Sequence, residues 1–112
     1  MVHRRARYLV LLAALLAAPA IAQVRTPPIP EDSRRGIIRH IEQMAVTVDG
    51  KLMQLAAGAQ IRDQQNLVIV PVSIPSEGAW ADFVLDGAGQ IVRVWLLTPG
   101  EFAQPKPASG GG

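Results

Sequence analysis

The chain contains no cysteine, which excludes disulfide bonds, thiolate metal ligands and thiol catalysis. Aromatic residues are scarce, at 4% of the 112 residues, so aliphatic side chains must form most of any buried core. Histidine occurs only at positions 3 and 40, and no serine lies in a nucleophile-elbow motif. A Ser-His-Asp arrangement is therefore not predicted. We expect neither an enzyme nor a bound cofactor.

The first 22 residues have the pattern of a secretory signal peptide. A basic start at residues 3–7 is followed by an apolar run at residues 8–18 and by small residues just before position 23. A retained membrane anchor is the competing interpretation, but this stretch is shorter than the roughly 20 apolar residues that span a bilayer, and Pro19 interrupts it. We expect cleavage after Ala22, a periplasmic or secreted protein, and no stable membrane insertion afterwards.

Cleavage changes the charge balance. Of the 11 Lys and Arg residues, three precede the cleavage position, which leaves eight basic residues against nine acidic ones and a formal net charge of about −1. The basic character of the whole chain therefore belongs mainly to the signal segment. Without a sustained basic surface to neutralise phosphates, nucleic-acid binding is not predicted.

The rest of the chain divides into three parts. Residues 23–35 contain three prolines and are predicted to be a flexible linker that tethers rather than packs. Residues 36–103 are predicted to form one small β domain, and residues 104–112, rich in proline and glycine, a disordered tail. Residues 36–43 fit either one face of a short helix or a strand, and we favour a strand that enters the sheet.

The strongest local signal is the dipeptide Asp49-Gly50, which favours the positive φ angles of a two-residue type I′ hairpin. Such a turn pairs Val48 with Lys51 and Thr47 with Leu52. Because strand side chains alternate, one face of this hairpin is predicted to be the core side. Its members are Met44, Val46, Val48, Met53 and Leu55.

A second hairpin is predicted around residues 86–89. A loop with Gly89 in the left-handed conformation pairs Leu85 with Ile91, and continued regular pairing places Phe83 opposite Arg93 and Ala81 opposite Trp95. In this register Asp82 lies opposite Val94. After the second strand, Thr98-Pro99-Gly100-Glu101 has the cap, first-position proline and third-position glutamate of a short helix.

Between the hairpins, residues 56–58 are expected to turn the chain into residues 59–62, and residues 63–66 to turn it again. Residues 67–72 are apolar on both faces, which is typical of a strand covered on two sides. Pro71 should end this strand or place it at an edge. Together the patterns predict a mainly β fold, a small antiparallel barrel or sandwich of about five to six strands built on two hairpins.

Three side chains form a candidate metal site. An imidazole and two thioethers are soft ligands that suit cuprous copper, and His40, Met44 and Met53 could provide them. Packing in the core is the alternative for the two methionines, because both fall on the core face of the first hairpin. We keep the binding of copper or another soft metal as the alternative to the favoured function. Because core packing also explains the two methionines, we assign no residue as a metal ligand.

Asp82 lies in mid-strand between apolar neighbours, whereas most other carboxylates fall in turns or caps. It could belong to a pair of carboxylates in a hydrolase. The alternative is an outward-facing residue or the partner of a hydrogen bond, and we favour this structural interpretation.

The favoured function is a non-enzymatic binding module that contacts a second copy of the chain or an envelope protein. The run that is apolar on both faces needs a cover, which we expect a partner to provide for so short a chain, and two tryptophans of the second hairpin could mark a recognition surface. The candidate interaction residues are Val68, Val70, Val72, Trp80 and Trp95.

Four short motifs carry a resemblance to other proteins, and they are Val48-Asp49-Gly50-Lys51, Gly58-Ala59-Gln60-Ile61-Arg62, Asn66-Leu67-Val68 and Val94-Trp95-Leu96-Leu97-Thr98-Pro99. Through these motifs the chain resembles small, signal-peptide-bearing envelope proteins of proteobacteria with a compact β domain and no known function. The resemblance covers most of residues 44–101 and implies an envelope location and a compact β fold, but no functional residue.

Overall fold

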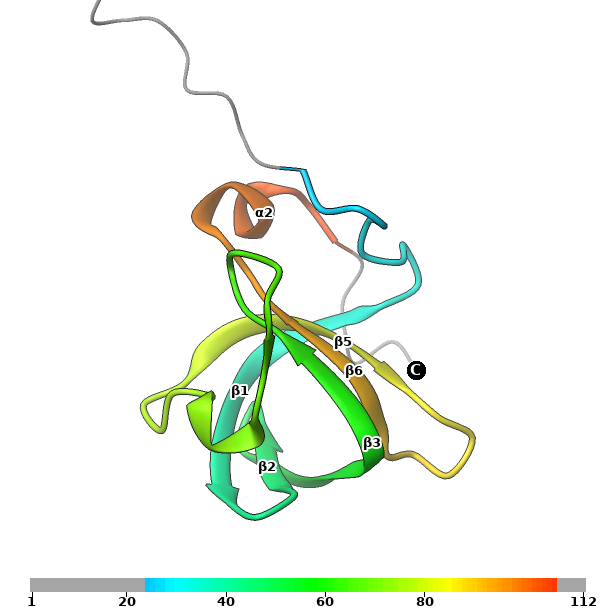
Figure 1. Cartoon of the computed structure of the whole chain (residues 1–112), viewed down its shortest axis with the longest axis vertical. Helices are drawn as coiled ribbons and strands as arrows, with labels where there is room; N and C mark the ends of the chain where they lie inside the picture. The colour runs from blue at the N-terminus through cyan, green and yellow to red at the C-terminus, as the bar shows by residue number, and fades with distance from the viewer. Residues whose placement is uncertain (1–23, 107–112) are drawn as a thin grey trace, which may run out of the picture.

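The computed structural model describes residues 24–106, so the predicted signal segment and residues 107–112 lie outside the described part (Figure 1). In chain order the elements are β1 (Arg34–Glu42), β2 (Ala45–Val48), β3 (Lys51–Arg62), β4 (Val68–Ile69), the 3-10 turn η1 (Pro71–Ser73), β5 (Ala79–Leu85), β6 (Ile91–Leu96) and α2 (Pro99–Ala103). The mainly β prediction is confirmed. No helix in this part of the chain is both long and apolar enough to span a membrane.

The six strands form one mixed sheet in the order β2-β1-β5-β6-β3-β4. Because β2 also pairs with β3, the sheet nearly closes into a ring, as Figure 1 shows. Of the two predicted closures, barrel and sandwich, this arrangement is the barrel-like one. The prediction of a purely antiparallel sheet is wrong in one place, since β3 and β6 run parallel.

The first hairpin has the predicted register. Val48 pairs with Lys51, Thr47 with Leu52, and Val46 with Met53. Both turn residues have positive φ angles, 51° at Asp49 and 82° at Gly50, as a type I′ turn requires.

β1 confirms the preference for a strand at residues 36–43, although it begins two residues earlier, at Arg34. Asp49 of the first hairpin turn is hydrogen-bonded to β1, because its backbone N–H donates to the Ile37 carbonyl at 2.9 Å. In return, the Ile37 N–H donates to Asp49 Oδ1 at 2.8 Å. Gly36 makes this close approach possible, because a Cβ there would lie 2.8 Å from Asp49 Oδ2.

β3 differs from the prediction. The expected turn at residues 56–58 is absent, and the strand runs for 12 residues. Gly58 has a φ of 76°, and the pairing with β6 shifts its register between Leu55 and Gln60. The glycine therefore allows an irregularity within one bent strand, where the sequence suggested a turn between two strands. This long strand contacts β2, β6 and β4 in turn.

The register predicted for the second hairpin is correct at its first pair and wrong beyond it. Leu85 pairs with Ile91 as predicted, and Gly89 has a φ of 82°. The next pair is Val84 with Arg93, so Val92 is an extra residue that shifts the remaining register by one. Asp82 consequently lies opposite Trp95, where regular pairing predicted Val94.

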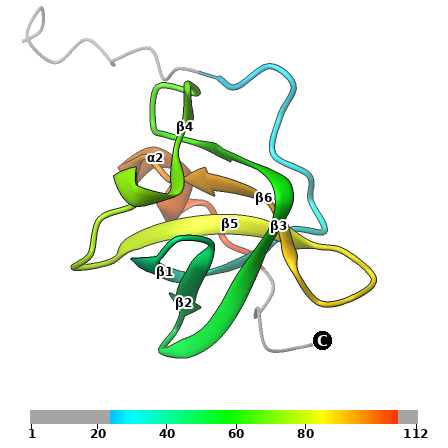
Figure 2. The ribbon, with the colours of Figure 1, turned by 60° about the horizontal axis from the view of Figure 1, so that its bottom comes forward.

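The predicted strand at residues 67–72 is much shorter than expected. Only Val68 and Ile69 pair, with Arg62 and Ile61 of β3, and η1 begins directly at Pro71. Pro71 lacks an amide donor and has the φ angle that a helical turn accepts, which explains the end of the strand. Figure 2 shows β4 at one end of the ring.

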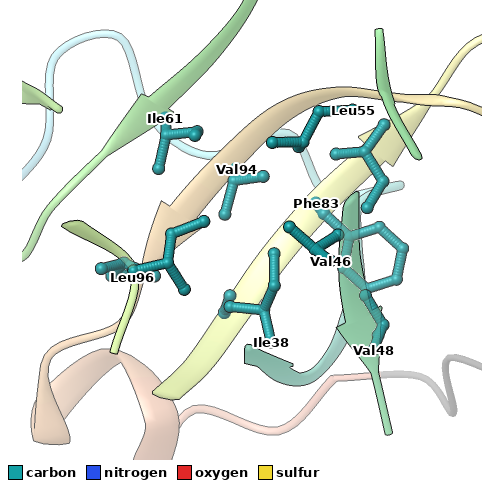
Figure 3. Packing of buried hydrophobic residues seen from close by; sticks show 11 residues of the cluster. Ile38, Val46, Val48, Leu55, Ile61, Phe83, Val94 and Leu96 are labelled. Carbon is teal, nitrogen blue, oxygen red and sulfur yellow. The ribbon is translucent and has the colours of Figure 1, made fainter. Parts of the chain in front are cut away.

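The core fills the inside of the ring (Figure 3). Its buried members come from every strand except β4 and from the residue after η1, and they are Ile38, Val46, Val48, Leu55, Ile61, Ile74, Ala81, Phe83, Ile91, Val94 and Leu96. Met44 and Met53 pack against this cluster and are partly buried, as the predicted core face of the first hairpin requires. Beyond β6, Thr98 and Glu101 form the predicted capping box of α2.

Candidate functional site

The outer face of the ring carries a row of polar and aromatic side chains across four strands. Strand pairing places Arg35 of β1 beside Asp82 of β5, Asp82 beside Trp95 of β6, and Trp95 beside Arg62 of β3. The neighbours of Trp95 in the chain, Val94 and Leu96, point into the core. Trp95 therefore faces outward, yet it is only 6% exposed, so it is covered from outside the ring.

Asp82 is a buried ion-pair partner at 2% exposure. Its two carboxylate oxygens accept from Arg35 Nε at 2.8 Å and Arg35 Nη2 at 3.2 Å, and Lys106 Nζ lies 3.6 Å from Oδ2. This placement agrees with the interpretation of Asp82 as the partner of a hydrogen bond and not as a member of a catalytic pair.

Lys106 belongs to the segment predicted to be a disordered tail, residues 104–112. Its Nζ donates to the Pro30 carbonyl, so the first residues of this segment contact the domain.

Arg25 corrects the interpretation of residues 23–35 as a tether that does not pack. Its side chain is buried, and all five N–H donors of its guanidinium have acceptors. Nε and Nη2 bind the Glu101 carboxylate at 2.7 and 2.9 Å, and Nη2 also donates to the Leu96 carbonyl. Nη1 donates to the Asp63 carbonyl at 2.8 Å and to Asn66 Oδ1 at 3.2 Å. One arginine thus joins the N-terminal segment to β6, α2 and the β3–β4 loop.

Two opposing effects act on the pKa of Glu101. Partial burial raises this pKa, but the hydrogen bonds and charge of Arg25, together with the Thr98 cap, outweigh burial and hold it below its ordinary value of 4.5. Because the folded-state pKa is the lower one, the carboxylate contributes stability that is fully present above the unfolded-state pKa. That contribution is lost as the pH falls through the folded-state value.

Substitution Glu101→Gln is therefore expected to cost stability at pH 7 and progressively less at acidic pH. Urea unfolding of the unsubstituted protein and of the variant, measured at pH 7 and at several values below 4.5, should show their difference shrinking as the pH falls. A difference that is constant across this range would contradict the ion pair with Arg25.

The three candidate metal ligands come from β1, β3 and the turn between β1 and β2. His40 pairs with Val46 and Val46 pairs with Met53, so β2 lies between His40 and Met53, whereas Met44 lies in the turn between β1 and β2. His40 Nε2 lies 2.9 Å from the Gln43 carbonyl. Within residues 24–106, no group of three or more His, Cys, Asp or Glu side chains is placed to hold a metal ion. Methionine is not among these side-chain types, so soft-metal binding by His40 with Met44 or Met53 stays a prediction.

The candidate interaction residues separate into two groups. Trp95 is buried on the outer face, whereas Trp80 is 41% exposed and stacks on Phe102 with ring centroids 4.6 Å apart. The two tryptophans thus form no shared exposed surface. The apolar run at residues 67–72 is largely exposed to solvent. Four of its side chains are between 57% and 72% exposed, and we call them the β4 surface: Leu67, Val68, Val70 and Val72.

Comparisons with protein-family models, with curated proteins and with solved structures gave no match. The compact β domain implied by the resemblance to proteobacterial envelope proteins is present, while membership of that group stays a prediction.

Proposed function

We propose that the chain is a non-enzymatic binding module that associates with a second copy of itself through the β4 surface. The observation that carries the proposal is the exposure of the four large aliphatic side chains of this surface within six consecutive residues. Contiguous exposed apolar patches on small proteins mark interaction sites, because their burial removes apolar area from water.

A second copy fits this surface for geometric reasons. β4 pairs with β3 on one side, and its other edge pairs with no strand within residues 24–106. Two such edges can meet in antiparallel orientation about a twofold axis, which makes the surface complementary to itself. Residues 67–74 contain no charged side chain, so no like charges within this stretch would face each other across a twofold axis.

The same proposal places the protein in the periplasm or outside the cell. It depends on the signal pattern of residues 1–22, which lie outside the described part of the chain. Intact mass of the protein recovered from an envelope fraction should correspond to a chain that begins at Gln23. A chain that keeps residue 1 would contradict cleavage.

The association is tested by light scattering over a wide concentration range. The unsubstituted protein is expected to approach the mass of a dimer as its concentration rises. Substitution Val70→Lys places a charge in the β4 surface and should shift the dissociation constant at least tenfold, because desolvation of an unpaired ammonium costs more than 1.4 kcal/mol.

A matched control is Leu52→Lys. Leu52 is 69% exposed but lies in the first hairpin, away from β4, so this variant should associate like the unsubstituted protein. A monomer at every concentration would refute self-association, and so would equal weakening by both substitutions.

A further inference from the structure

A pocket of about 130 Å³ opens on the outer face of the ring between β3, β6 and the N-terminal segment. Pro27 and Pro28 form one wall, and Trp95 lies at the sheet side. Arg25 holds this segment in place through the contacts described above, so the pocket exists because residues 25–28 pack on the domain. The pocket shares no residue with the β4 surface, although the two adjoin where Arg62 pairs with Val68, and this inference does not depend on the proposed self-association.

Two arginines line the pocket from adjacent strands. Gln60 pairs with Arg93, and Arg62 pairs with Trp95, so the register brings Arg62 and Arg93 to neighbouring positions on one face. The lining contains no carboxylate, and neither arginine forms an ion pair within residues 24–106. The acidic residue next to Arg62 in sequence, Asp63, directs Oδ1 to the backbone N–H groups of Gln65 and Leu67.

The amide side chains of the pocket are oriented to donate. Gln60 Oε1 accepts from Arg62 Nε at 3.3 Å, and Asn66 Oδ1 accepts from Arg25 Nη1. Because each amide oxygen is turned toward an arginine, each NH₂ group is left as the free donor. Arg62 Nη1 donates to the Asn66 carbonyl, while no acceptor within residues 24–106 binds Arg62 Nη2 or the Arg93 guanidinium. The pocket therefore presents N–H donors and positive charge.

We propose that this pocket binds a small oxyanion group, a carboxylate or a phosphate, held between Arg62 and Arg93 with Gln60 and Asn66 as additional donors. Guanidinium groups bind both anions with two parallel hydrogen bonds. The indole of Trp95 and the rings of Pro27 and Pro28 provide an apolar wall for the body of the ligand. At about 130 Å³ the space is well below the roughly 300 Å³ of sites for drug-sized molecules, which restricts the ligand to a small one.

Isothermal titration calorimetry of the full chain with sodium benzoate and, separately, with inorganic phosphate tests the proposal. At least one probe should bind with a dissociation constant of about 1 mM or tighter. Binding of benzoate alone assigns a carboxylate ligand, and binding of phosphate alone a phosphate ligand. Arg62→Gln and Arg93→Gln should each weaken binding about tenfold, as expected for loss of one charge-assisted hydrogen-bonding partner.

Two further variants make the test specific. Gln60→Glu puts a carboxylate at an exposed position of the pocket and should abolish binding, whereas Arg34→Gln removes an exposed arginine that does not line the pocket and should leave affinity within about twofold. Thermal unfolding of each variant verifies the fold. The proposal is overturned if neither probe binds at about 10 mM, or if the pocket variants bind as tightly as Arg34→Gln.

Discussion

Substitution Arg25→Ala is expected to lower the free energy of unfolding by about 3 kcal/mol, because removal of one partner from a buried ion pair leaves the other groups uncompensated. The side chain of Arg25 is 5% exposed and that of Glu101 is 24% exposed. The alanine variant would remove the arginine donor from the carbonyls of Asp63 and Leu96 and from the Asn66 amide, and would leave the Glu101 carboxylate with the Thr98 N–H but without its cation. Urea unfolding at pH 7 measures the loss.

Arg34→Ala is the matched control for this prediction. Arg34 is exposed in β1 and has no side-chain hydrogen bond within residues 24–106, so its loss should change stability by less than about 0.5 kcal/mol. Arg25→Lys should recover only part of the stability, because an ammonium has three donors and cannot reproduce the two-pronged contact with Glu101. Equal stability of the Arg25→Ala and Arg34→Ala proteins would show that residues 24–28 do not pack as described.

Substitution Asp82→Ala is expected to cost about 3 kcal/mol by the same physical mechanism. Asp82 is 2% exposed, and its loss leaves Arg35, with a side chain 14% exposed, beside the sheet without its carboxylate. Arg35 also donates to the Gln104 carbonyl at 2.7 Å, so the variant should loosen the contact between β1 and the segment after α2.

A double-mutant cycle separates this ion pair from other effects. Arg35→Ala combined with Asp82→Ala should cost less than the sum of the two single changes, with a coupling of about 2 kcal/mol. Glu42→Ala, at the exposed end of β1, is the control and should be nearly neutral. Additive single changes would mean that Arg35 and Asp82 do not stabilise one another.

Features that depend on local chemistry could be predicted from the sequence. Asp49-Gly50 fixed both the turn and the register of the first hairpin, since few other residues accept two positive φ angles in succession. The capping box at Thr98 and Glu101 is likewise a property of four adjacent residues. The burial of Val46, Val48 and Leu55 followed from alternation once the register was known.

Features that depend on distant parts of the chain could not be predicted. Val92 has no sequence signal that distinguishes it as an extra residue, so the second hairpin was placed one position out of register beyond Leu85. Gly58 signals a positive φ angle but does not distinguish a turn from an irregularity within a strand. The parallel pairing of β3 and β6 joins strands separated by β4 and β5, which no local pattern reports.

The polar contacts of the outer face were missed for a related reason. Arg25 lies in a segment whose prolines suggest an extended linker, and its acceptors come from residues 38 to 76 positions away. Arg62 and Arg93 are unremarkable in sequence, because only the parallel register brings them to one pocket. The aliphatic residues of the β4 surface form a run that is apolar on both faces in the sequence, but of these residues only Val68 lies in a strand.

We propose that this β domain acts by association through the β4 surface, and an amide chemical-shift map recorded over a dilution series is the most direct test of that association. We expect concentration-dependent shifts concentrated in residues 67–73, apart from Pro71, which has no amide proton, with little change at the first hairpin. Shifts that are absent over the whole range, or that fall on the first hairpin and leave residues 67–73 unchanged, would contradict it.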